Sequence, residues 1–443
     1  MKILFVCQYF YPEVFSGNDI AFHWAEEGHD VHVVCGTPNY PDGVFHEGYG
    51  LFKKRHEVVN GVKVTRLPIV PRGHNNIMLI LNYFSYLIVG WVWMLFHAAF
   101  HKYDCVFVQQ LSPVMMSAPG VLYKRLRGVP LYTWVLDLWP ESLTAAGGIH
   151  NKYVLGFFRH FVRSEYRHSD KICISSRSFE VSILEYGNYK DKIVYFPQWA
   201  DSGTDTNSTT DTDNNYSSDS NDSCSKEETV CECDFLKRQE LENLKIKYNL
   251  PALPEGFRLM FAGALGEAHG FECTMQAALL TKEHKEIKWV IVGDGRRLDW
   301  VRRFVKEHEL EDTVYTLGRF PAETMPWFFA QADVMLVTLS DAPLFRLYAP
   351  AKVSSYMAAG KPILAVLNGE GAEVIRDAGC GWTLTAGDAE GFARLAVELS
   401  QTDKAVLEEK GRKSAAYYEQ YFVKEKCLRK LDALVMSYEN KKL

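Results

Sequence analysis

Residues 343–373 contain residue types that could bind an anion. Lys352 stands close to the hydroxyls of Ser354 and Ser355, on a loop that opens a helical pattern. The first amides of a helix have no backbone partner and carry partial positive charge, so a lysine placed there could help hold a phosphate group. An ordinary solvated surface lysine is the alternative, because a single lysine before a helix is common.

Three glycine turns end predicted strands in the C-terminal half. They are Gly263 and Gly266 with Glu267 after the first strand, Gly293 and Gly295 after the second, and Gly318 with Arg319 after the third. Glycine lets a backbone approach a phosphate closely, although each turn could equally be an ordinary strand end. The first turn lacks the full GxGxxG spacing and no acidic residue ends a following strand, which disfavours a nicotinamide-dependent dehydrogenase.

The N-terminal half offers two further segments. The loop of residues 11–17 follows the first strand and ends at Gly17, so it could close over bound phosphates. Asp137 and Glu141 follow the strand pattern PLYTWVL, where a carboxylate could orient a reacting hydroxyl or stabilise a developing positive carbon. Capping of a helix N-terminus is the structural alternative for these two carboxylates.

Length, charge and cysteine content restrict the class of protein. A chain of 443 residues exceeds what one core usually supports, so two domains are expected. The formal net charge of −6 argues against a nucleic-acid partner. Ten cysteines with no secretory signal ahead of them predict a reducing compartment. Cys224, Cys231 and Cys233 lack a second pair at ligand spacing, so we predict loop thiols and no metal site.

Buried-strand patterns alternate with helical patterns through both halves of the chain. This alternation predicts an α/β fold with two Rossmann-like, doubly wound domains facing a cleft at the carboxyl ends of their strands. The expected divisions are a first domain at 1–196, a linker at 197–255, a second domain at 256–420, and a helix at 421–443 that crosses back to the first domain. Within the linker, 201–233 is rich in Ser, Thr, Asp and Asn, and we predict a disordered insertion that is either an ordinary surface loop or a segment for phosphorylation or interaction.

Residues 77–100 carry no formal charge and are long enough to cross a bilayer. The segment could span the membrane, lie in its interface, or pack as a buried helix. A single span would separate the first strands from the rest of their domain, so we disfavour it. Aromatic residues suit the interface, and a nearby basic run could contact anionic lipid. The aromatic residues are Tyr83, Tyr86, Trp91 and Trp93, and the basic run is Lys53, Lys54 and Arg55.

Several strings together resemble the family 4 retaining glycosyltransferases of the GT-B type, and in particular the WbuB-like branch of bacterial surface-polysaccharide synthesis. They span nearly the whole chain in matching order. They are QYFYPE, EEGHDVHVVCGTPNYPDG, HEGYG, DLWPES, FPQWAD, GALGEAHGFE, WVIVGDG, LGRFPAETMPWFFAQADVMLV and PAKVSSYMAAGKPILAVLNGEGAEVI.

The resemblance implies that the second domain holds a nucleotide-sugar donor and the first holds the acceptor, with no metal or other cofactor in the chemistry. It implies Lys352 at the diphosphate and Arg319 near the base. The full predicted donor-binding set is Gly17, Gly263, Gly266, Glu267, Gly293, Gly295, Arg319, Lys352, Ser354 and Glu373. The predicted catalytic set is Asp137, Glu141 and Lys352.

The chain departs from the family pattern at several places, one of which is the insertion at 201–233. The usual pair of glutamates, with seven residues between them, is missing, and Leu347 and Ser355 stand at those positions. Residues 264–270 contain no lysine or arginine, although many family members carry a basic residue there. Neutralisation of a diphosphate would therefore fall largely on Lys352 and helix amides, with Arg346 as an added contact.

The predicted function is retaining transfer of a sugar, with an N-acetylated amino sugar as a candidate, from a UDP-linked donor. The predicted acceptor is a polyprenyl-diphosphate-linked saccharide of cell-surface polysaccharide synthesis. The protein itself is expected to be peripheral or monotopic on the cytoplasmic face of the membrane. Two alternatives are a GT-B-fold nucleotide-sugar epimerase and a non-catalytic subunit that binds nucleotide sugar as a scaffold.

Overall fold

The computed structural model describes residues 1–147, 150–200 and 239–437. The predicted insertion at 201–233, with Cys224, Cys231 and Cys233, lies outside these residues. The chain divides into two compact units. Unit 1 comprises Met1–Trp199, Ala342–Tyr348 and Lys424–Leu443, and unit 2 comprises Ala200–Asp341 and Ala349–Val423.

Unit 1 is built on an eight-stranded sheet of order β3-β4-β2-β1-β5-β6-β7-β8, in which only the β3–β4 pair is antiparallel. The strands are β1 (Lys2–Val6), β2 (Asp30–Gly36), β3 (His56–Val59), β4 (Val62–Leu67), β5 (Cys105–Gln110), β6 (Leu131–Val135), β7 (Lys171–Ile174) and β8 (Ile193–Tyr195). Chain order reverses between β1 and β5, the position at which doubly wound sheets bind ligands.

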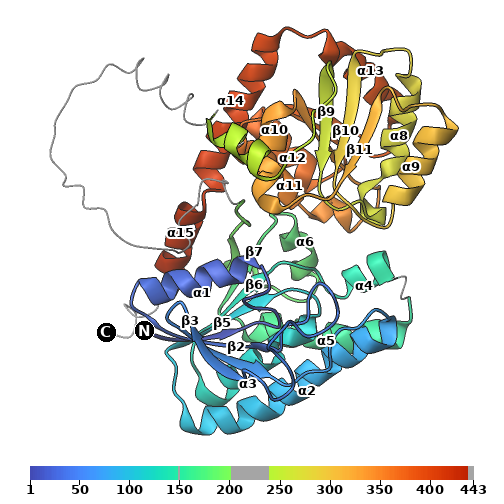
Figure 1. Ribbon diagram of the computed structural model, residues 1–443. Helices are drawn as coiled ribbons and strands as arrows, with labels where there is room; N and C mark the ends of the chain where they lie inside the picture. Colours follow the sequence, from blue (N-terminus) through green and yellow to red (C-terminus); the bar gives the residue numbers. More distant parts are fainter. Residues whose placement is uncertain (148–149, 201–238, 438–443) are drawn as a thin grey trace, which may run out of the picture. The chain divides into compact units, whose positions relative to one another are not determined.

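Helices connect the parallel strands of unit 1 (Figure 1). They are α1 (Ser16–Glu26), α2 (Asn76–Phe100), α3 (Ala118–Arg127), α4 (Glu141–Gly147), α5 (Lys152–His168), α6 (Phe179–Leu184) and α15 (Lys424–Met436), with short 3-10 turns at η1 (Val114–Ser117), η2 (Lys190–Lys192) and η5 (Phe345–Leu347). The C-terminal α15 packs on α1, where Asp432 accepts a hydrogen bond of 2.8 Å from Trp24 Nε1.

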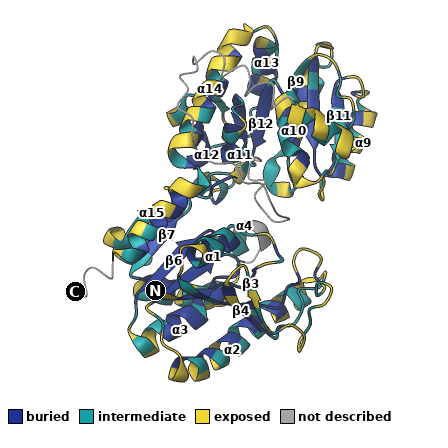
Figure 2. Ribbon diagram, turned by 60° about the vertical axis from the view of Figure 1, so that its left-hand side comes forward, coloured by how far each residue is buried: buried dark blue, intermediate teal, exposed yellow. Residues whose placement is uncertain are grey.

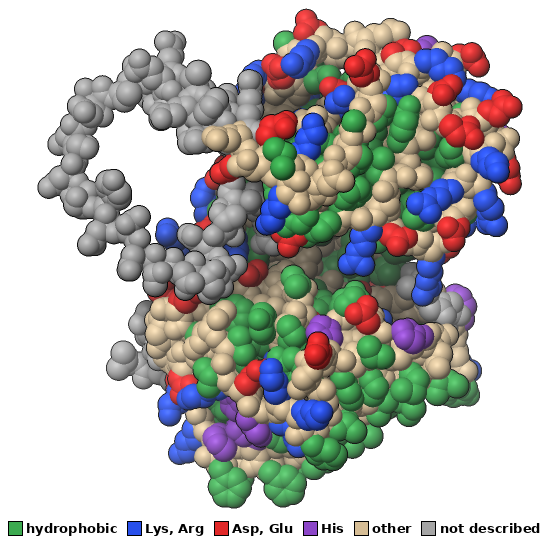
Figure 3. Space-filling model, viewed as in Figure 1, with side chains coloured by type: hydrophobic (Ala, Val, Ile, Leu, Met, Phe, Trp, Pro, Cys, Tyr) green, Lys and Arg blue, Asp and Glu red, His purple; other side chains and the backbone are tan. Residues whose placement is uncertain are grey.

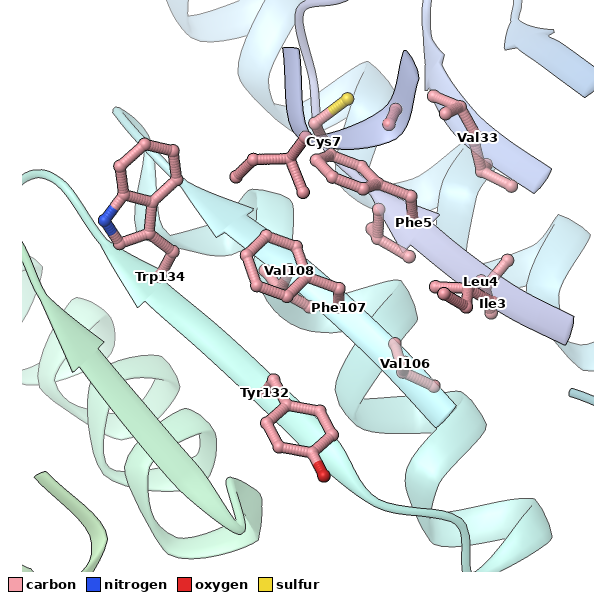
Figure 4. Close-up of a cluster of buried hydrophobic side chains, with 14 of the residues drawn as sticks. Ile3, Leu4, Phe5, Cys7, Val33, Val106, Phe107, Val108, Tyr132 and Trp134 are labelled. Atoms are coloured by element: carbon pink, nitrogen blue, oxygen red, sulfur yellow. The ribbon is translucent and has the colours of Figure 1, made fainter. Parts of the chain in front are cut away.

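The core of unit 1 lies on the central strands. Figure 4 shows Phe5 of β1, Phe107 of β5 and Trp134 of β6 among its side chains, and all three are fully buried. The rings of Phe5 and Phe107 lie 5.2 Å apart. Burial of each such side chain stabilises the fold by about 1.5–3 kcal/mol, which explains why the central strands are continuous apolar runs.

Unit 2 is built on six parallel strands of order β11-β10-β9-β12-β13-β14. They are β9 (Phe257–Ala262), β10 (Ile287–Val292), β11 (Val314–Gly318), β12 (Val334–Thr338), β13 (Ile363–Val366) and β14 (Gly381–Leu384). The helices are α8 (Phe271–Leu280), α9 (Leu298–Glu307), α10 (Met325–Gln331), α11 (Ala351–Ala358), α12 (Glu370–Ala378), α13 (Ala389–Ser400) and α14 (Lys404–Tyr421), with 3-10 turns at η3 (Glu267–His269) and η4 (Ala322–Thr324). Residues 239–247 are also helical.

The strand order of unit 2 places β9 at the topological switch point, between β10 and β12. Two doubly wound α/β domains are therefore present, and the predicted fold class is confirmed. Residues 342–348 differ from the sequence-based division, which assigned them to the second domain. They belong to unit 1, because the Tyr348 ring packs on Phe179 at 4.8 Å and the Tyr348 hydroxyl accepts a hydrogen bond of 2.9 Å from the amide of Leu138.

Helix α2 buries one stripe, partly buries side chains that flank it, and exposes apolar side chains such as Ile88 and Phe96 (Figure 2). The stripe consists of Asn82, Tyr86, Gly90, Met94 and Ala98. Only 22% of its most apolar 18-residue stretch is buried. The interpretation of 77–100 as a buried helix is therefore wrong. By length and composition α2 could cross a membrane. In the structure its buried stripe packs against the core of unit 1.

Candidate functional site

Lys352 lies at the carboxyl end of β9 in unit 2. It is the second residue of α11, which begins after Pro350, and its Nζ lies 4.1 Å from the centroid of the Phe261 ring. A Cβ atom on Gly263 would lie 2.5 Å from Lys352 Cε, so the glycine makes room for the lysine. Burial lowers the pKa of Lys352 to about 7, and the ring face offsets part of the cost of holding its charge there.

Tyr356, one turn further along α11, fixes this arrangement. Its hydroxyl accepts a hydrogen bond from the amide of Ala262 and donates one to the carbonyl of the same residue, each at 3.0 Å. Tyr356 is fully buried, so the two bonds lock α11 against the last residue of β9. The register of this contact places Lys352 over Gly263.

His269 lies beside Lys352, in the 264–270 loop that contains no lysine or arginine. Its Nδ1 lies 3.1 Å from the amide nitrogen of Gly266, and its carbonyl accepts a 2.6 Å hydrogen bond from Thr338 Oγ1. Burial, together with the charge of Lys352, lowers the pKa of His269 to about 4. The imidazole is therefore neutral at pH 7, and with Nδ1 accepting from Gly266 it carries its proton on Nε2.

Gly293 and Gly295 let the loops after β9 and β10 pack backbone to backbone. A Cβ on Gly293 would lie 1.9 Å from the carbonyl oxygen of Gly263, and one on Gly295 would lie 2.5 Å from that of Leu265. The amide of Leu265 also donates a 2.9 Å hydrogen bond to the carbonyl of Asp294. This packing accounts for both glycines without a ligand and holds the Gly263 loop in place.

The remaining predicted donor-binding residues of unit 2 are either bonded within the protein or exposed. Ser354 is buried, and its hydroxyl donates to the carbonyl of Ala351 in its own helix at 2.8 Å. Glu267 forms an ion pair of 3.7 Å with Arg297. Arg319 and Glu373 are exposed.

Neither Arg319 nor Glu373 has a side-chain hydrogen bond or ion pair with the residues that the structure describes. The structure thus brings together Gly263, Lys352 and the overlooked His269. A histidine within a glycine turn is the sequence signal that indicates this group.

Asp137 follows β6 in unit 1 and is surrounded by donors. Ser112 Oγ, Ser142 Oγ and the Tyr348 hydroxyl donate to its carboxylate, and Trp139 Nε1 donates at 3.1 Å. Among the described residues, the carboxylate accepts from side chains and from no helix N-terminal amide. Its lone pairs are occupied by side chains that join the β6 loop to the segment containing Tyr348.

Glu141 differs from Asp137 in its hydrogen bonding. It is the first residue of α4, and one carboxylate oxygen accepts a 3.3 Å hydrogen bond from the Tyr186 hydroxyl. The other oxygen, Oε2, is buried and has no hydrogen-bond partner among the described residues. Burial raises the pKa of Glu141, which favours its protonated form.

Gly17 is the second residue of α1, whereas the sequence analysis placed it in the loop before the helix. A Cβ at this position would lie 2.0 Å from Oε1 of Gln109, the penultimate residue of β5. The absent side chain therefore makes room for Gln109 at the switch point of unit 1.

No group of three or more His, Cys, Asp and Glu side chains in residues 1–147, 150–200 and 239–437 is arranged to hold a metal ion. Lys352 and His269 contribute an amine and an imidazole beside Gly263, and the only carboxylate of the 263–270 loop, that of Glu267, pairs with Arg297. Such groups suit an anion better than a cation.

Comparison with known proteins identifies the class. Residues 18–199 match the model of the glycosyl transferase 4-like domain, and residues 256–402 match that of the glycosyl transferases group 1. Together the two models cover most of the chain. The protein therefore belongs to the family 4 glycosyltransferases with the GT-B fold.

Individual relatives are more distant. The probable glycosyltransferase WbjE of Pseudomonas aeruginosa is 29% identical over 286 residues, which are 62% of this chain and 62% of the relative. The putative colanic acid biosynthesis glycosyl transferase WcaI of Escherichia coli is 21% identical over 378 residues, covering 81% of this chain and 82% of the relative. The crystal structure of HepE from Anabaena in complex with UDP aligns with a TM-score of 0.63 at 14% identity, over 99% of this chain and 100% of that one.

Proposed function

We propose that the protein is a retaining glycosyltransferase that uses a nucleoside diphosphate sugar, with UDP as the nucleotide. The observation that carries the proposal is Lys352, a partly buried lysine at the N-terminus of α11 that lies over Gly263 at the switch point of a Rossmann unit. Family membership, and a structural neighbour determined with UDP, support a nucleotide-sugar donor.

The donor diphosphate would lie between Lys352 and the loop of residues 263–270. Lys352 contributes an ammonium, the N-terminal amides of α11 contribute partial positive charge, and the Nε2–H of His269 contributes a neutral donor. These groups replace the lysine or arginine that many family members carry in the 264–270 loop.

In the transfer, the bond between the anomeric carbon and the diphosphate oxygen breaks while an acceptor hydroxyl oxygen bonds to the same face of that carbon. The proton of the acceptor hydroxyl passes to a diphosphate oxygen, and the nucleoside diphosphate leaves. Negative charge grows on the diphosphate as the bond lengthens, so a fixed cation at Lys352 stabilises the transition state more than the ground state.

Glu141 is the acceptor-side group that we propose for contact with substrate. Its buried Oε2 has no partner among the described residues and could accept a hydrogen bond from an acceptor hydroxyl. Asp137, with four donors, positions the β6 loop and the segment containing Tyr348.

We further propose that the acceptor is a polyprenyl-diphosphate-linked saccharide of cell-surface polysaccharide synthesis at the cytoplasmic face of the membrane. The name of WcaI, a colanic acid biosynthesis relative, supports the pathway class. The exposed apolar surface of α2 supports a membrane-surface location, with the helix lying in the interface.

The nucleotide can be identified by thermal unfolding of the chain with UDP, GDP, TDP or CMP, alone and as sugar conjugates. A ligand at a hundred times its Kd stabilises the folded state by about 2.7 kcal/mol, a measurable shift in Tm. We expect UDP to raise Tm in the wild type and in Lys306→Ala, an exposed lysine of α9, but not in Lys352→Ala.

Other outcomes would favour the alternatives. Donor binding without turnover on any acceptor would favour the scaffold subunit. Release of the nucleotide or epimerisation of the sugar without an acceptor would favour the epimerase.

A further inference from the structure

A second polar site lies at the opposite edge of the unit 1 sheet from Asp137 and Glu141. A cavity of about 660 Å³ is bordered by Lys2 and Asp30, the first residues of β1 and β2, and by residues of β3 and β4. Residues 100–103, which follow α2, complete its wall. The proposed transfer reaction uses no residue of this cavity.

The charges that face the cavity leave an excess of cations. Its two carboxylates are already neutralised, since Asp30 pairs with Lys63 at 2.7 Å and Glu57 pairs with the buried Arg66. Lys2 and Lys102 also line the cavity and have no side-chain ion pair with a described residue. His56 and His101 add imidazole donors at the same wall.

A network of hydrogen bonds holds that wall in shape. The Tyr103 hydroxyl contacts His32 and lies 2.8 Å from Nε2 of His97, whose ring stacks on His101 with centroids 3.9 Å apart. Burial lowers the pKa of His32 to about 4 and that of His97 to about 3, so both are neutral near pH 7 and act as scaffold. The positive charge comes from the lysines at the rim.

The exposed apolar face of α2 ends at this cavity. Phe100, the last residue of the helix, lines the cavity with 83% of its surface exposed, and Phe96 is 69% exposed one turn earlier. Figure 3 shows hydrophobic side chains along the lower edge of unit 1, where α2 runs, and a group of histidine side chains just above the projecting ones at the lower left. At a membrane surface, the apolar side chains would contact lipid acyl chains and the neighbouring lysines would contact anionic headgroups.

We propose that the cavity binds the phosphate headgroup of an anionic phospholipid while the adjacent face of α2 lies in the same bilayer surface. The inference rests on the membrane location in the proposed function and adds a lipid class and a binding site. Contacts along α2 and at its C-terminal end would hold the helix parallel to the membrane, with its first turn nearest the loops that contain Asp137 and Glu141.

The test is flotation of the full chain with vesicles of phosphatidylcholine alone and of phosphatidylcholine with phosphatidylglycerol at 7:3. We expect the wild type to favour the anionic vesicles at least tenfold. Lys102→Ala should lower partition into anionic vesicles about fivefold, the effect of one cation at an anionic surface, and leave binding to neutral vesicles unchanged. Phe100→Ser should lower binding to both vesicle types.

Lys306→Ala, an exposed lysine of unit 2, is the matched control and should behave like the wild type. Equal binding of the wild type to both vesicle types, or unchanged binding of Lys102→Ala, would overturn the proposal. Binding of inorganic phosphate by a chain that shows no preference for anionic vesicles would also overturn it, since the cavity would then serve free phosphate. Lys102→Ala should still bind the donor, as measured by the UDP-dependent shift in Tm. Failure of the lipid-site proposal is therefore distinguishable from failure of the proposed function.

Discussion

Lys352 combines a positive charge with an apolar setting, and this combination makes donor binding depend on pH. Burial lowers its pKa to about 7, so the amine is largely neutral above that pH in the free protein. A bound diphosphate favours the charged form, and binding should therefore take up a proton.

We predict that the affinity for UDP, measured by calorimetry, falls by up to tenfold per pH unit above pH 7 and changes little below it. In Lys352→Met this decline should disappear, together with most of the affinity. An affinity of the wild type that stays constant between pH 7 and 9 would contradict the assignment of Lys352 to the diphosphate.

The two acceptor-side carboxylates should respond differently to amide substitution. Glu141→Gln keeps the shape of the side chain, and the buried Oε2 that it alters has no partner to lose, so we expect Tm within a few degrees of the wild type. Because the carboxylate is lost, we expect turnover to fall by roughly two powers of ten. In Asp137→Asn one carboxylate oxygen becomes an NH2 group, which cannot accept hydrogen bonds from the donors that face it. We expect this loss to lower the free energy of unfolding by about 1–3 kcal/mol.

Urea unfolding and an assay of sugar transfer separate these effects. Full turnover in Glu141→Gln would remove Glu141 from the reaction. A normal Tm for Asp137→Asn would show that its hydrogen bonds contribute little to the fold.

At the scale of elements, the segment of residues 342–348 is held in unit 1 by the buried Leu344, by a hydrogen bond from Ser176 Oγ to the carbonyl of Leu347, and by the Tyr348 side chain. The Tyr348 hydroxyl accepts from the amide of Leu138 and donates to Asp137, and its ring packs edge-on against Phe179. Tyr348→Phe keeps the ring but leaves the amide of Leu138 without its acceptor and removes one of the donors to Asp137.

We therefore expect Tyr348→Phe to lower the free energy of unfolding by about 1–3 kcal/mol in urea titrations. Tyr153→Phe is the matched control, because Tyr153 is 77% exposed on α5, and it should cost less than about 0.5 kcal/mol. Equal effects of the two substitutions would mean that the Tyr348 hydroxyl does not anchor the segment.

At the scale of the whole molecule, Glu165 of α5 makes the stability of unit 1 depend on pH. Its carboxylate is buried without a hydrogen bond among the described residues, and burial raises its pKa to about 8. The carboxyl group of Glu165 has a higher pKa in the folded chain than in the unfolded chain, where it is near 4.5. Its contribution to stability is therefore complete below pH 4.5 and is lost as the pH rises toward 8.

The free energy of unfolding of the wild type should therefore fall relative to that of Glu165→Gln by at most about 1.4 kcal/mol per pH unit between pH 5 and 8. Urea titrations of both proteins at pH 5.5 and 7.5 measure this difference. A difference that does not change with pH would show that Glu165 keeps the same pKa in the folded and unfolded chains.

Much of the architecture could be predicted from the sequence, because parallel strands that are buried on both faces appear as continuous apolar runs. The approach of Lys352 to Gly263 follows from the topology as well, since the loops after β9 and β12 meet at the switch point. His269, the donors around Asp137 and the placement of residues 342–348 could not be predicted, because each depends on contacts between segments distant in sequence or on desolvation. Composition alone also left open how much of α2 is exposed.

The most direct test of the proposed function is the rate of sugar transfer by Lys352→Ala, compared with wild type and Lys306→Ala at saturating donor. Loss of one fixed donor to a developing negative charge costs roughly two to three powers of ten in kcat, so we predict a loss of that size for Lys352→Ala and none for the control. Near-normal kcat in Lys352→Ala would contradict the role of this lysine at the leaving diphosphate.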